Sequence, residues 1–399
     1  MTAPWLSIVG IGEDGLSGLA PAARPLVEGA EILMGGARHL AMVPDDGREK
    51  IVWPSPLLAV VERLRALRGR PVCVLASGDP QWFGIGSTLR REFPGKDMRI
   101  VPGQSAFSLA AARLAWSIDD VTCMTLHGRP VELVKAALYP GAKILALAHD
   151  RTTPAIVADL LANSGFGGSH LTVLEHMDGG EEKIITGDAA TWSHVGADLH
   201  TIAIHCTNAP TQSWQSRVPG LPDEVFIHDG KLTKREIRAA TLSKLMPAPN
   251  ALLWDIGVGC GSIAIEWMRA AKNARAIGLD NKPDRLRMAS DNAIALGTPG
   301  LKLVEGLAPD GLADLVAPDA VFIGGGLSEE VFSAAWKCLK PGGRLVANAV
   351  TLESEAVLLR LHAEYSGDLV RIAVQRAAPV GPFRGWKPLM PVTQWSVMK

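Results

Sequence analysis

Residues 252–268, LLWDIGVGCGSIAIEWM, constrain the fold of this chain more than any other stretch. Leu252, Leu253 and Trp254 form an apolar run of strand length, and the mostly apolar residues from Ser262 onward are typical of a helix. The glycines between them permit positive φ angles and leave bare backbone for a ligand, while the helix start offers free N–H groups. This stretch therefore predicts a strand, a turn that binds a nucleotide-like ligand, and a helix.

The spacing of these glycines distinguishes between two kinds of nucleotide. The dinucleotide pattern G-x-G-x-x-G would need its third glycine at the position of Ser262. The pattern present, D-x-G-x-G-x-G from Asp255 to Gly261, resembles motif I of the class I S-adenosylmethionine (SAM) methyltransferases. A second apolar strand ends at Asp280, whose carboxylate can accept hydrogen bonds from both ribose hydroxyls. Either acidic residue could instead serve only as a helix cap.

Composition narrows the class of protein. The chain has 399 residues, enough for two or three domains, and its 40 Lys plus Arg against 41 Asp plus Glu give a net charge of −1. This balance creates no global field for nucleic acid or an anionic membrane, so neither is expected as a partner. The five cysteines are scattered without C-x-x-C, which argues against zinc and for a reduced compartment. Without a signal peptide or an apolar run near 18 residues, we expect a cytoplasmic location.

Residues 1–207 alternate short apolar runs with helical segments, a pattern typical of an α/β domain with a largely parallel sheet. Each run leads into a turn, and ligands of open α/β sheets bind beyond the carboxyl ends of the strands. The turns VGIGEDG, SGDPQWFGIG, PGQSAFSLAAARL and LHGR are therefore candidates for one shared site. The expected strands are 6–12, 71–76, 98–101, 121–126, 143–148, 171–175, 183–186 and 201–205.

The order of these four turns resembles the tetrapyrrole methyltransferases, and most closely their corrin branch. The resemblance implies a bilobal α/β fold that binds SAM between its lobes, with the first three turns around SAM and the macrocycle. From the residues alone, Asp79 could equally be a turn residue fixed by the following Pro80. The cofactor-binding residues that the resemblance implies in this half are Gly10, Gly12, Ser77, Gly78, Asp79, Pro102, Gly103 and Ser105.

The fourth turn carries His127 and Arg129, for which two roles are open. A neutral histidine at a strand end is commonly a hydrogen-bonded structural residue. Next to Arg129 in a cleft, it could instead meet carboxylates of the substrate, so both residues are candidate catalytic residues. None of the ten histidines has the spacing of a metal site, and no metal is expected.

Residues 208–222 contain three prolines and polar residues without periodicity, which predicts a linker between a domain at 1–207 and a second domain at 223–399. The second domain continues the alternation of strands and helices and ends in a pair of strands expected at 369–376 and 390–398. Its seven strands with a terminal hairpin predict a Rossmann-like class I methyltransferase fold.

A basic helical segment follows the linker. Lys234, Arg235 and Arg238 are spaced to lie along one side of a helix, as a solvated surface or as a cationic gate for a substrate rich in carboxylates. Near the end of the fifth strand, an amide and a carboxylate could face the substrate or could cap a strand and a helix. The candidate groups for proton transfer and substrate binding in this half are Lys231, Lys234, Arg235, Arg238, Asn348 and Glu353.

The runs TKREIR, DIGVGCGS, EGLAP, DAVFIGGG and LKPGGRLVANAVTLES resemble the decarboxylating precorrin methyltransferase subunit of cobalamin synthesis. A tetrapyrrole methyltransferase domain ahead of it is the domain order of the decarboxylating precorrin-6B (precorrin-6Y) C5,15-methyltransferase family. The resemblance implies SAM-dependent methylation of a precorrin at carbons 5 and 15 with decarboxylation of the ring C acetate, and two SAM sites per chain without metal or pyridoxal phosphate. It departs at Leu307, where the family often has Asp. The SAM-binding residues expected in this half are Thr233, Asp255, Gly257, Val258, Gly259, Cys260, Gly261, Asp280 and Ala308.

Two other classes of function stay open on the sequence. A SAM-dependent tRNA base methyltransferase would use a similar class I domain, although the neutral net charge and the tetrapyrrole-type first half argue against it. A SAM-binding scaffold with one inactive half is the second, although both ligand loops keep their glycines. We further expect a homo-oligomer that acts on a precorrin tetrapyrrole.

Overall fold

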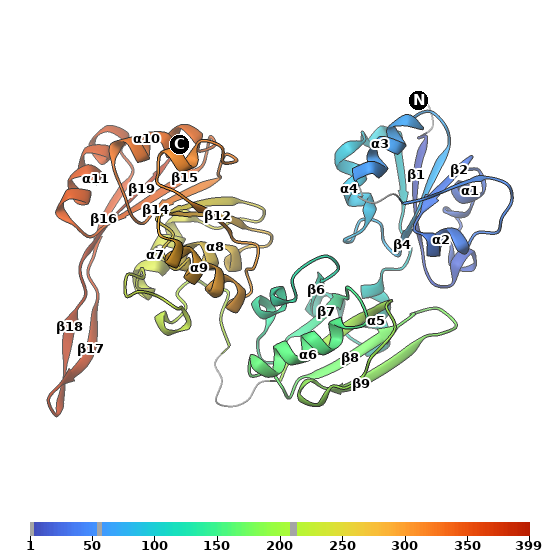
Figure 1. Cartoon of the computed structure of the whole chain (residues 1–399), viewed down its shortest axis with the longest axis horizontal. Helices are drawn as coiled ribbons and strands as arrows, with labels where there is room; N and C mark the ends of the chain where they lie inside the picture. Colours follow the sequence, from blue (N-terminus) through green and yellow to red (C-terminus); the bar gives the residue numbers. More distant parts are fainter. Residues whose placement is uncertain (1–3, 54–57, 208–213) are drawn as a thin grey trace. The chain divides into compact units, whose positions relative to one another are not determined.

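The computed structural model describes residues 4–53, 58–207 and 214–399. Residues 208–213 of the predicted linker lie outside the described residues. Each of the two compact units of the chain alternates strands with helices and has its own hydrophobic core (Figure 1). The units are Met1–Val131 with Pro140–Gln212, and Glu132–Tyr139 with Ser213–Lys399.

The first unit begins with a parallel sheet of five strands in the order β3-β2-β4-β1-β5. Alternate residues of the fully buried β1 enter opposite cores, Leu6 and Ile8 on one face and Val9 and Ile11 on the other, as the period of a strand requires. The short strands β2 and β3 were not predicted, because four residues hardly show a period. The elements are β1 Leu6–Ile11, α1 Arg24–Glu28, β2 Ile32–Gly35, α2 Ala37–Ala41, β3 Glu49–Val52, α3 Leu58–Ala66, β4 Val72–Ser77, α4 Ile85–Glu92 and β5 Met98–Val101.

A second sheet of five strands, in the order β6-β7-β10-β8-β9, completes the first unit. The prediction of a largely parallel sheet is wrong here, because β10 runs antiparallel to β7 and β8, and β9 antiparallel to β8. The connections at 176–182 and 189–199 contain no α-helix, and a parallel neighbour usually needs a helical crossover. The elements are α5 Ala106–Leu114, β6 Val121–Thr125, β7 Lys143–Leu147, α6 Thr153–Asn163, β8 His170–Glu175, β9 Lys183–Asp188 and β10 His200–His205.

The second unit is built on a sheet of seven strands in the order β13-β12-β11-β14-β15-β19-β16. The first five strands of this order run parallel to one another, and β19 is antiparallel to both of its neighbours, β15 and β16. The predicted Rossmann-like fold with seven strands is confirmed. The elements are α7 Arg235–Leu245, β11 Leu252–Ile256, α8 Ser262–Ala270, β12 Arg275–Asp280, α9 Pro283–Ala295, β13 Lys302–Glu305, β14 Ala320–Ile323, α10 Glu329–Cys338, β15 Arg344–Ala349, α11 Leu352–Tyr365, β16 Asp368–Ile372, β17 Gln375–Val380, β18 Phe383–Pro388 and β19 Val392–Met398.

The central strand β11 is buried on both faces, as expected for a parallel strand between helical layers. Leu252, Trp254 and Ile256 pack in the core that includes α10 and α11. Leu253 packs in the core that includes α7 and α8. Asp255 therefore points toward the α7 and α8 side, where the next element of the chain begins.

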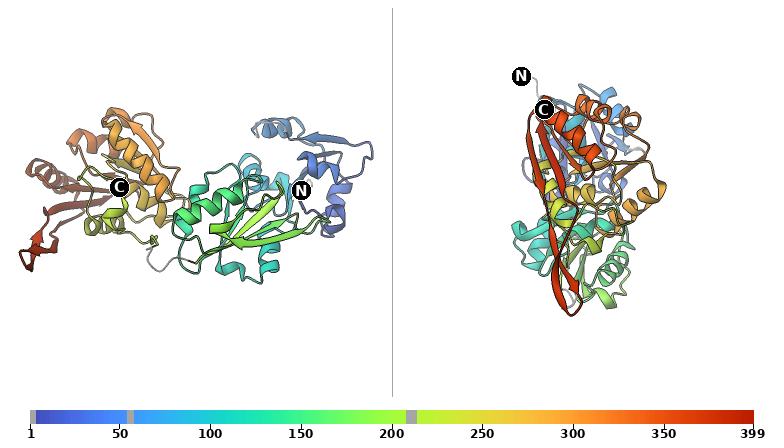
Figure 2. Two further views of the ribbon diagram at one scale, coloured as in Figure 1. Left: turned by 60° about the horizontal axis from the view of Figure 1, so that its bottom comes forward. Right: turned by 90° about the vertical axis from the view of Figure 1, so that its left-hand side faces the viewer.

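The C-terminal strands differ from the predicted pair. β16 and β19 do pair antiparallel, but the chain between them forms a separate two-stranded hairpin, β17 and β18. This hairpin extends away from the seven-stranded sheet (Figures 1 and 2). In the part of the chain that the structure describes, no helix is both long and apolar enough to cross a membrane.

Candidate functional site

The turn after β11 has the geometry that its glycines predict. Gly257, Gly259 and Gly261 have φ of +76°, +54° and +84°, all in the left-handed region that residues with a side chain rarely adopt. A Cβ atom on Gly257 would also lie 2.8 Å from the backbone nitrogen of Gly325. The predicted order of strand, glycine turn and helix is confirmed, and the turn presents bare backbone.

The two remaining residues of this turn, Val258 and Cys260, direct their side chains into hydrophobic cores. The Cys260 carbonyl accepts a hydrogen bond from Nδ2 of Asn292 at 2.9 Å. The same amide pairs with both backbone groups of Ile227. The predicted contacts of Val258 and Cys260 with SAM are therefore limited to main-chain atoms, and Asn292 is a supporting residue that the sequence analysis missed.

Asp255 is 2 % exposed, and its Oδ2 accepts a hydrogen bond from the Ala264 nitrogen at 3.0 Å. Burial raises the pKa of Asp255 to about 7, and the nearby charge of Asp280 adds to the rise, while the hydrogen bond from Ala264 opposes it. The side chain thus braces the start of α8, which is the capping role that the sequence analysis kept as an alternative.

Asp280, the last residue of β12, is 5 % exposed and lies next to the same turn. Its Oδ2 accepts a hydrogen bond from Gly259 N, and its Oδ1 accepts one from Lys282 N, both at 3.1 Å. The Arg285 guanidinium is 3.8 Å from Oδ2. Because each carboxylate oxygen can accept more than one hydrogen bond, this arrangement leaves acceptor capacity for ribose hydroxyls. That contact with SAM stays a prediction.

Two further loops reach this edge of the sheet. The glycine run 324–326 follows β14, and Gly324 N donates to the Ile256 carbonyl at 2.9 Å. The sequence analysis did not assign this run to the site, although three successive glycines after a strand were an available signal. In the loop after β13, Ala308 is half-buried and Leu307 is 65 % exposed. Leu307 is apolar, so its side chain supplies no hydrogen bond at this position.

Arg238 does not lie on an exposed basic face, and this part of the prediction is wrong. Its side chain is 0 % exposed, with Nε 2.6 Å from Glu266 and one terminal nitrogen 3.1 Å from Asp223. It also donates to the carbonyls of Thr233 and Leu221. Arg238 belongs to the buried stripe of α7, and its two carboxylate partners come from segments whose approach the sequence does not reveal. It is a structural centre of the second unit.

The other predicted cations of this segment remain accessible. Lys231 and Arg235 are exposed and Lys234 is half-buried. Among the described residues, none of the three has a carboxylate within ion-pair distance, so their charges are available to a ligand. Thr233, predicted to contact SAM, is half-buried beside them, and its carbonyl is occupied by Arg238 at 2.5 Å.

Asn348 lies in a polar group between α7, β15 and β19. Its Nδ2 donates to Thr241 at 3.0 Å, and its Oδ1 accepts from Gln394 at 2.9 Å. Glu353 is exposed in the first turn of α11. The Asn348 amide thus connects β15 to α7 and β19 rather than capping a strand, and the cap of α11 is Thr351, whose hydroxyl accepts from Ser354 N. A catalytic role for Asn348 or Glu353 stays a prediction.

In the first unit, the structure brings the three predicted turns together at their glycines. A Cβ atom on Gly10 would lie 1.8 Å from the Gly78 carbonyl oxygen and 2.2 Å from the Gly103 nitrogen. Gly103 N donates to the Gly78 carbonyl at 3.0 Å, and Gly78 N to the Ile11 carbonyl at 3.1 Å. Only backbone fits at this junction, as expected where turns converge on a ligand. SAM binding there stays a prediction.

The other predicted residues of these turns have local roles. Ser105 is buried and caps α5, since its hydroxyl accepts from Ser108 N at 3.0 Å. Asp79 accepts from Gln81 N at 2.8 Å, which is the turn geometry considered as its alternative. Gly12 is half-buried and Pro102 is exposed, both at the same edge of the sheet.

A polar group beside this junction was not predicted. Ser77 Oγ is 3.0 Å from Nε2 of His39, and Arg38 lies 3.0 Å from the same nitrogen and 3.2 Å from Ser77. Burial and the Arg38 charge lower the pKa of His39 to about 4, so its ring is neutral near pH 7. Arg38 also pairs with Glu13, the residue after Gly12. The sequence signal for Arg38 and His39 was weak, because helix α2 contains no recognisable motif.

His127 and Arg129 are exposed on the loop after β6. The His127 ring centroid lies 5.2 Å from that of His149, and the Arg129 guanidinium carbon lies 5.8 Å from the Phe83 ring centroid. Because Phe83 belongs to the SGDPQWFGIG turn, this contact brings the fourth predicted turn to the second one. Their catalytic role stays a prediction.

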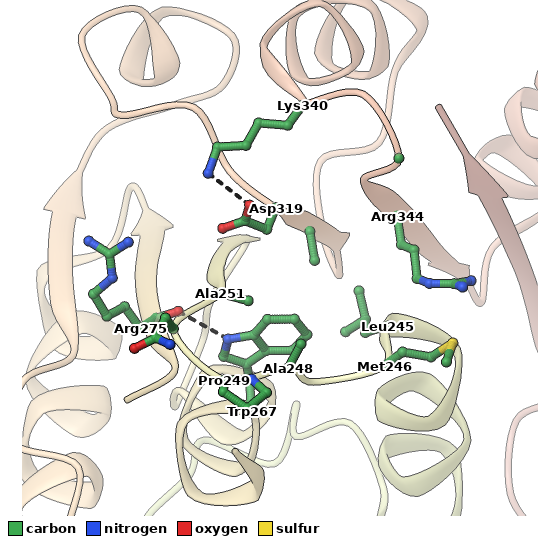
Figure 3. A pocket seen from close by; sticks show the side chains of 13 residues that line it. Leu245, Met246, Ala248, Pro249, Ala251, Trp267, Arg275, Asp319, Lys340 and Arg344 are labelled. Carbon is green, nitrogen blue, oxygen red and sulfur yellow. Dashed lines mark hydrogen bonds and ion pairs between the residues drawn. The ribbon is translucent and has the colours of Figure 1, made fainter. Parts of the chain in front are cut away.

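A pocket of ≈ 500 Å³ lies at the opposite edge of the seven-stranded sheet, at the amino ends of its parallel strands (Figure 3). Trp267, whose ring nitrogen donates to the Arg275 carbonyl at 3.0 Å, forms part of the wall. Lys340 pairs with Asp319 at 2.7 Å on the rim. None of the predicted site residues lines this pocket, which is therefore separate from the ligand loops.

The two halves match different family models. Residues 6–194 match the tetrapyrrole (corrin/porphyrin) methylases, and residues 224–399 match the precorrin methyltransferase domain. The chain thus joins a tetrapyrrole methylase to a precorrin methyltransferase domain. A precorrin-6Y C(5,15)-methyltransferase [decarboxylating] of Sinorhizobium sp is 48 % identical over 404 residues, 100 % of this chain and 97 % of that protein. The chain belongs to the family of precorrin-6Y C(5,15)-methyltransferases (decarboxylating).

Shorter relatives match parts of the chain. A cobalt-precorrin-7 C(5)-methyltransferase of Salmonella typhimurium is 32 % identical over 179 residues, 45 % of this chain and 88 % of that protein. A Saccharolobus solfataricus protein named "Probable cobalt-precorrin-6B C(15)-methyltransferase (decarboxylating)" is 36 % identical over 148 residues, 35 % of this chain and 74 % of that protein. In these names, decarboxylation accompanies methylation at carbon 15.

Proposed function

We propose that this chain is an enzyme that methylates carbons 5 and 15 of a precorrin with SAM and decarboxylates the ring C acetate in cobalamin synthesis. The observation that carries this function is the 48 % identity along the whole chain to a relative with that name. The alternative of a tRNA base methyltransferase is not supported, since both halves match precorrin or tetrapyrrole families.

The residues of the two junctions fit the demands of this chemistry. Methyl transfer from a sulfonium to carbon is an in-line displacement, so the protein mainly positions the reactants and excludes water. Gly10 and Gly257 let neighbouring turns pack backbone to backbone, which exposes main-chain groups to a ligand, and Asp280 keeps acceptor capacity beside the second junction. SAM supplies the methyl group when bound, and the conjugated macrocycle takes up the electrons left by the departing carboxyl group.

Two SAM molecules bind each chain in this proposal, one at the Gly10 junction and one at the Gly257 turn. The support is that each unit has its own glycine junction at the carboxyl ends of its strands. Isothermal titration of the intact chain with SAM should give two sites. A single site would remove this part of the proposal.

The second unit performs decarboxylation together with methylation at carbon 15, and the first unit methylates carbon 5. The support is the resemblance of residues 223–399 to the decarboxylating subunit, and the pairing of decarboxylation with carbon 15 in the name of one relative. The exposed Lys231 and Arg235 could hold the acid side chains of the macrocycle. Carbon 15 comes first, because the relatives named for carbons 15 and 5 act on cobalt-precorrin-6B and cobalt-precorrin-7.

Mass spectrometry of the product tests the function directly. The intact chain, given SAM and the metal-free precursor, should add two methyl groups and release one carbon dioxide. A product with one added methyl group would contradict the assignment of two methylation sites. tRNA given in place of the precursor should gain no methyl group, and its methylation would restore the alternative.

A homo-oligomer is also part of the proposal. The hairpin β17–β18 carries Phe383 and Trp386, which are 76 % and 72 % exposed, and Val380 at 62 %. Apolar side chains gathered on an exposed hairpin are typical of a contact surface. Sedimentation of the wild type and of Phe383→Ser with Trp386→Ser should show an oligomer that the double variant weakens. A monomeric wild type would contradict the proposal.

A further inference from the structure

A histidine–carboxylate pair connects two distant loops of the first unit beside the glycine junction. His176 Nδ1 lies 2.9 Å from Oε2 of Glu13, although the two residues are 163 positions apart in the sequence. Glu13 follows Gly12, and His176 follows the end of β8. Neither residue was a predicted site residue.

The pair fixes which ring nitrogen of His176 is free. Glu13 is held on its other oxygen by Arg38, so it is an ionised carboxylate that can only accept hydrogen bonds. The Nδ1 atom of His176 must therefore carry a proton, and in the neutral ring Nε2 is the basic nitrogen. Among the described residues Nε2 has no hydrogen-bond partner, and the His176 side chain is 25 % exposed.

The backbone holds His176 in an unfavourable conformation. Its φ is +46°, in the left-handed region that a residue with a Cβ atom seldom adopts. The following loop is fixed by Arg113, which pairs with Asp178 at 2.5 Å and with Glu182 at 2.8 Å. Strained residues that the surrounding structure holds in place concentrate at functional sites, where the strain aims a side chain.

We propose that His176 is the general base of the methylation that the first unit performs, and that Glu13 is its positioning residue. This inference rests on the proposed function. A bridge carbon that bears hydrogen must lose a proton when it gains a methyl group. The new carbon–carbon bond forms as the sulfur–methyl bond breaks, and that electron pair stays on sulfur. The carbon–hydrogen pair returns to the macrocycle, and the proton goes to Nε2, where Glu13 stabilises the resulting imidazolium.

The variant His176→Ala, in the intact chain, tests the proposal. Removal of a general base typically costs at least about 100-fold in rate. With SAM and the metal-free precursor, the variant should release carbon dioxide and add one methyl group at the wild-type rate. The second methyl group should be added at least about 100-fold more slowly, with two SAM sites still present. Added imidazole should partly restore that step, because a small base can enter the space left by the side chain.

The matched control is His170→Ala. His170 is the first residue of β8, and its Nδ1 forms the same kind of pair with Asp188 at 2.6 Å, but it is exposed and lies at the opposite end of this strand from His176. The control should keep both methylations at the wild-type rate. A comparable loss in His170→Ala would overturn the proposal, because it would assign the loss to the stability of the second sheet.

Glu13→Gln and Glu13→Asp test the positioning role. Glu13→Gln should lower kcat of the affected methylation without changing KM for SAM, by less than His176→Ala does, and Glu13→Asp should keep more activity. Wild-type addition of both methyl groups by His176→Ala would overturn the base assignment and leave the proposed function intact. Loss of a SAM site in His176→Ala, or a slow step that imidazole does not restore, would overturn it as well. A wild-type chain that neither methylates nor decarboxylates a precorrin would instead refute the proposed function.

Discussion

The two units bring their glycines together in different ways. In the first unit, turns that are far apart in the sequence meet backbone to backbone at Gly10, Gly78 and Gly103. In the second, one continuous strand, turn and helix carries the glycines, and the buried carboxylates of Asp255 and Asp280 brace it. The first site depends on tertiary assembly, and the second depends on a local segment with electrostatic support. Substitutions should therefore damage the two sites in different ways.

The largest expected effect is the loss of one SAM site, and a different site should be lost in each of two glycine variants. Gly10→Ala places a Cβ atom 1.8 Å from the Gly78 carbonyl, and Gly257→Ala places one 2.8 Å from Gly325 N at a φ of +76°. Each variant should lose one SAM site of two, since no flexible side chain can move aside. We expect Gly257→Ala to lose decarboxylation and one methylation, and Gly10→Ala to lose the other methylation alone. Titration with SAM and mass spectrometry of the product check this.

Two glycines serve as controls for these variants. Gly342 has the same φ of +76°, but a Cβ atom there would meet nothing within 4 Å. A Cβ atom on Gly180 would likewise meet nothing within 4 Å, and Gly180 does not have a left-handed φ. Gly342→Ala and Gly180→Ala should keep both SAM sites. If Gly10→Ala removed carbon dioxide release as well, the division of labour between the units would be wrong.

The next largest effect concerns the buried charges of the second unit. Arg238→Met leaves Asp223 and Glu266 without their buried cation, which typically costs about 3–5 kcal/mol. Arg235→Met, three residues away on the exposed side of α7, should change stability by less than about 0.5 kcal/mol. Urea unfolding, followed for the transition of the second unit, measures both. Equal stability of the two variants would contradict the assignment of Arg238 as a structural centre.

The burial of Arg238 and the exposure of Arg235 could not both be predicted from the sequence. The pattern of 252–268 predicted a strand, a turn and a helix correctly, because their signals are local: an apolar run, a glycine spacing and a helical period. The same local reading placed Arg238 on an exposed face. Its burial depends on Asp223 and Glu266, which reach it through tertiary packing and match no local pattern.

The first unit shows the same limit. Its four turns were predicted to share one site, and three of them do meet at glycines, while the site itself stays a prediction. The contact of Glu13 with His176 spans 163 positions, and although Glu13 lies in the turn VGIGEDG, His176 belongs to no recognisable motif. The antiparallel course of β9 and β10 was missed as well, because an apolar run does not reveal its direction.

The third prediction uses the raised pKa of Asp255, about 7 in the folded chain against 3.8 as the ordinary value. Below pH 4 the carboxyl group is protonated in both folded and unfolded chains. Between about pH 4 and pH 7, Asp255 is ionised in the unfolded chain but still protonated in the folded chain. The free energy of unfolding therefore falls as the pH rises through this range. Asp255→Asn keeps an oxygen for Ala264 N and should remove this loss, which at about 1.4 kcal/mol per pH unit amounts to a few kcal/mol.

Urea unfolding at pH 5 and at pH 8 measures the effect of Asp255→Asn. We expect the advantage of Asp255→Asn over the wild type to grow between these pH values in the transition of the second unit. Asp291→Asn, an exposed position on α9, serves as the control and should follow the wild type at both. An advantage that stays constant with pH would show that Asp255 is ionised in the folded chain throughout.

The smallest expected effect asks whether Asp280 contacts SAM or only braces the turn. Asp280→Ala removes the acceptor of Gly259 N together with the charge predicted to meet the ribose, and should weaken one of two SAM sites by about 1.5–3 kcal/mol. Asp280→Asn keeps an oxygen for Gly259 N and should therefore lose less affinity. Asp284→Ala, an exposed position in the first turn of α9, should bind SAM like the wild type. If titration gave unchanged affinity at both sites for Asp280→Ala, the carboxylate would be a structural brace alone, and binding of SAM at the second site would then have to use backbone groups.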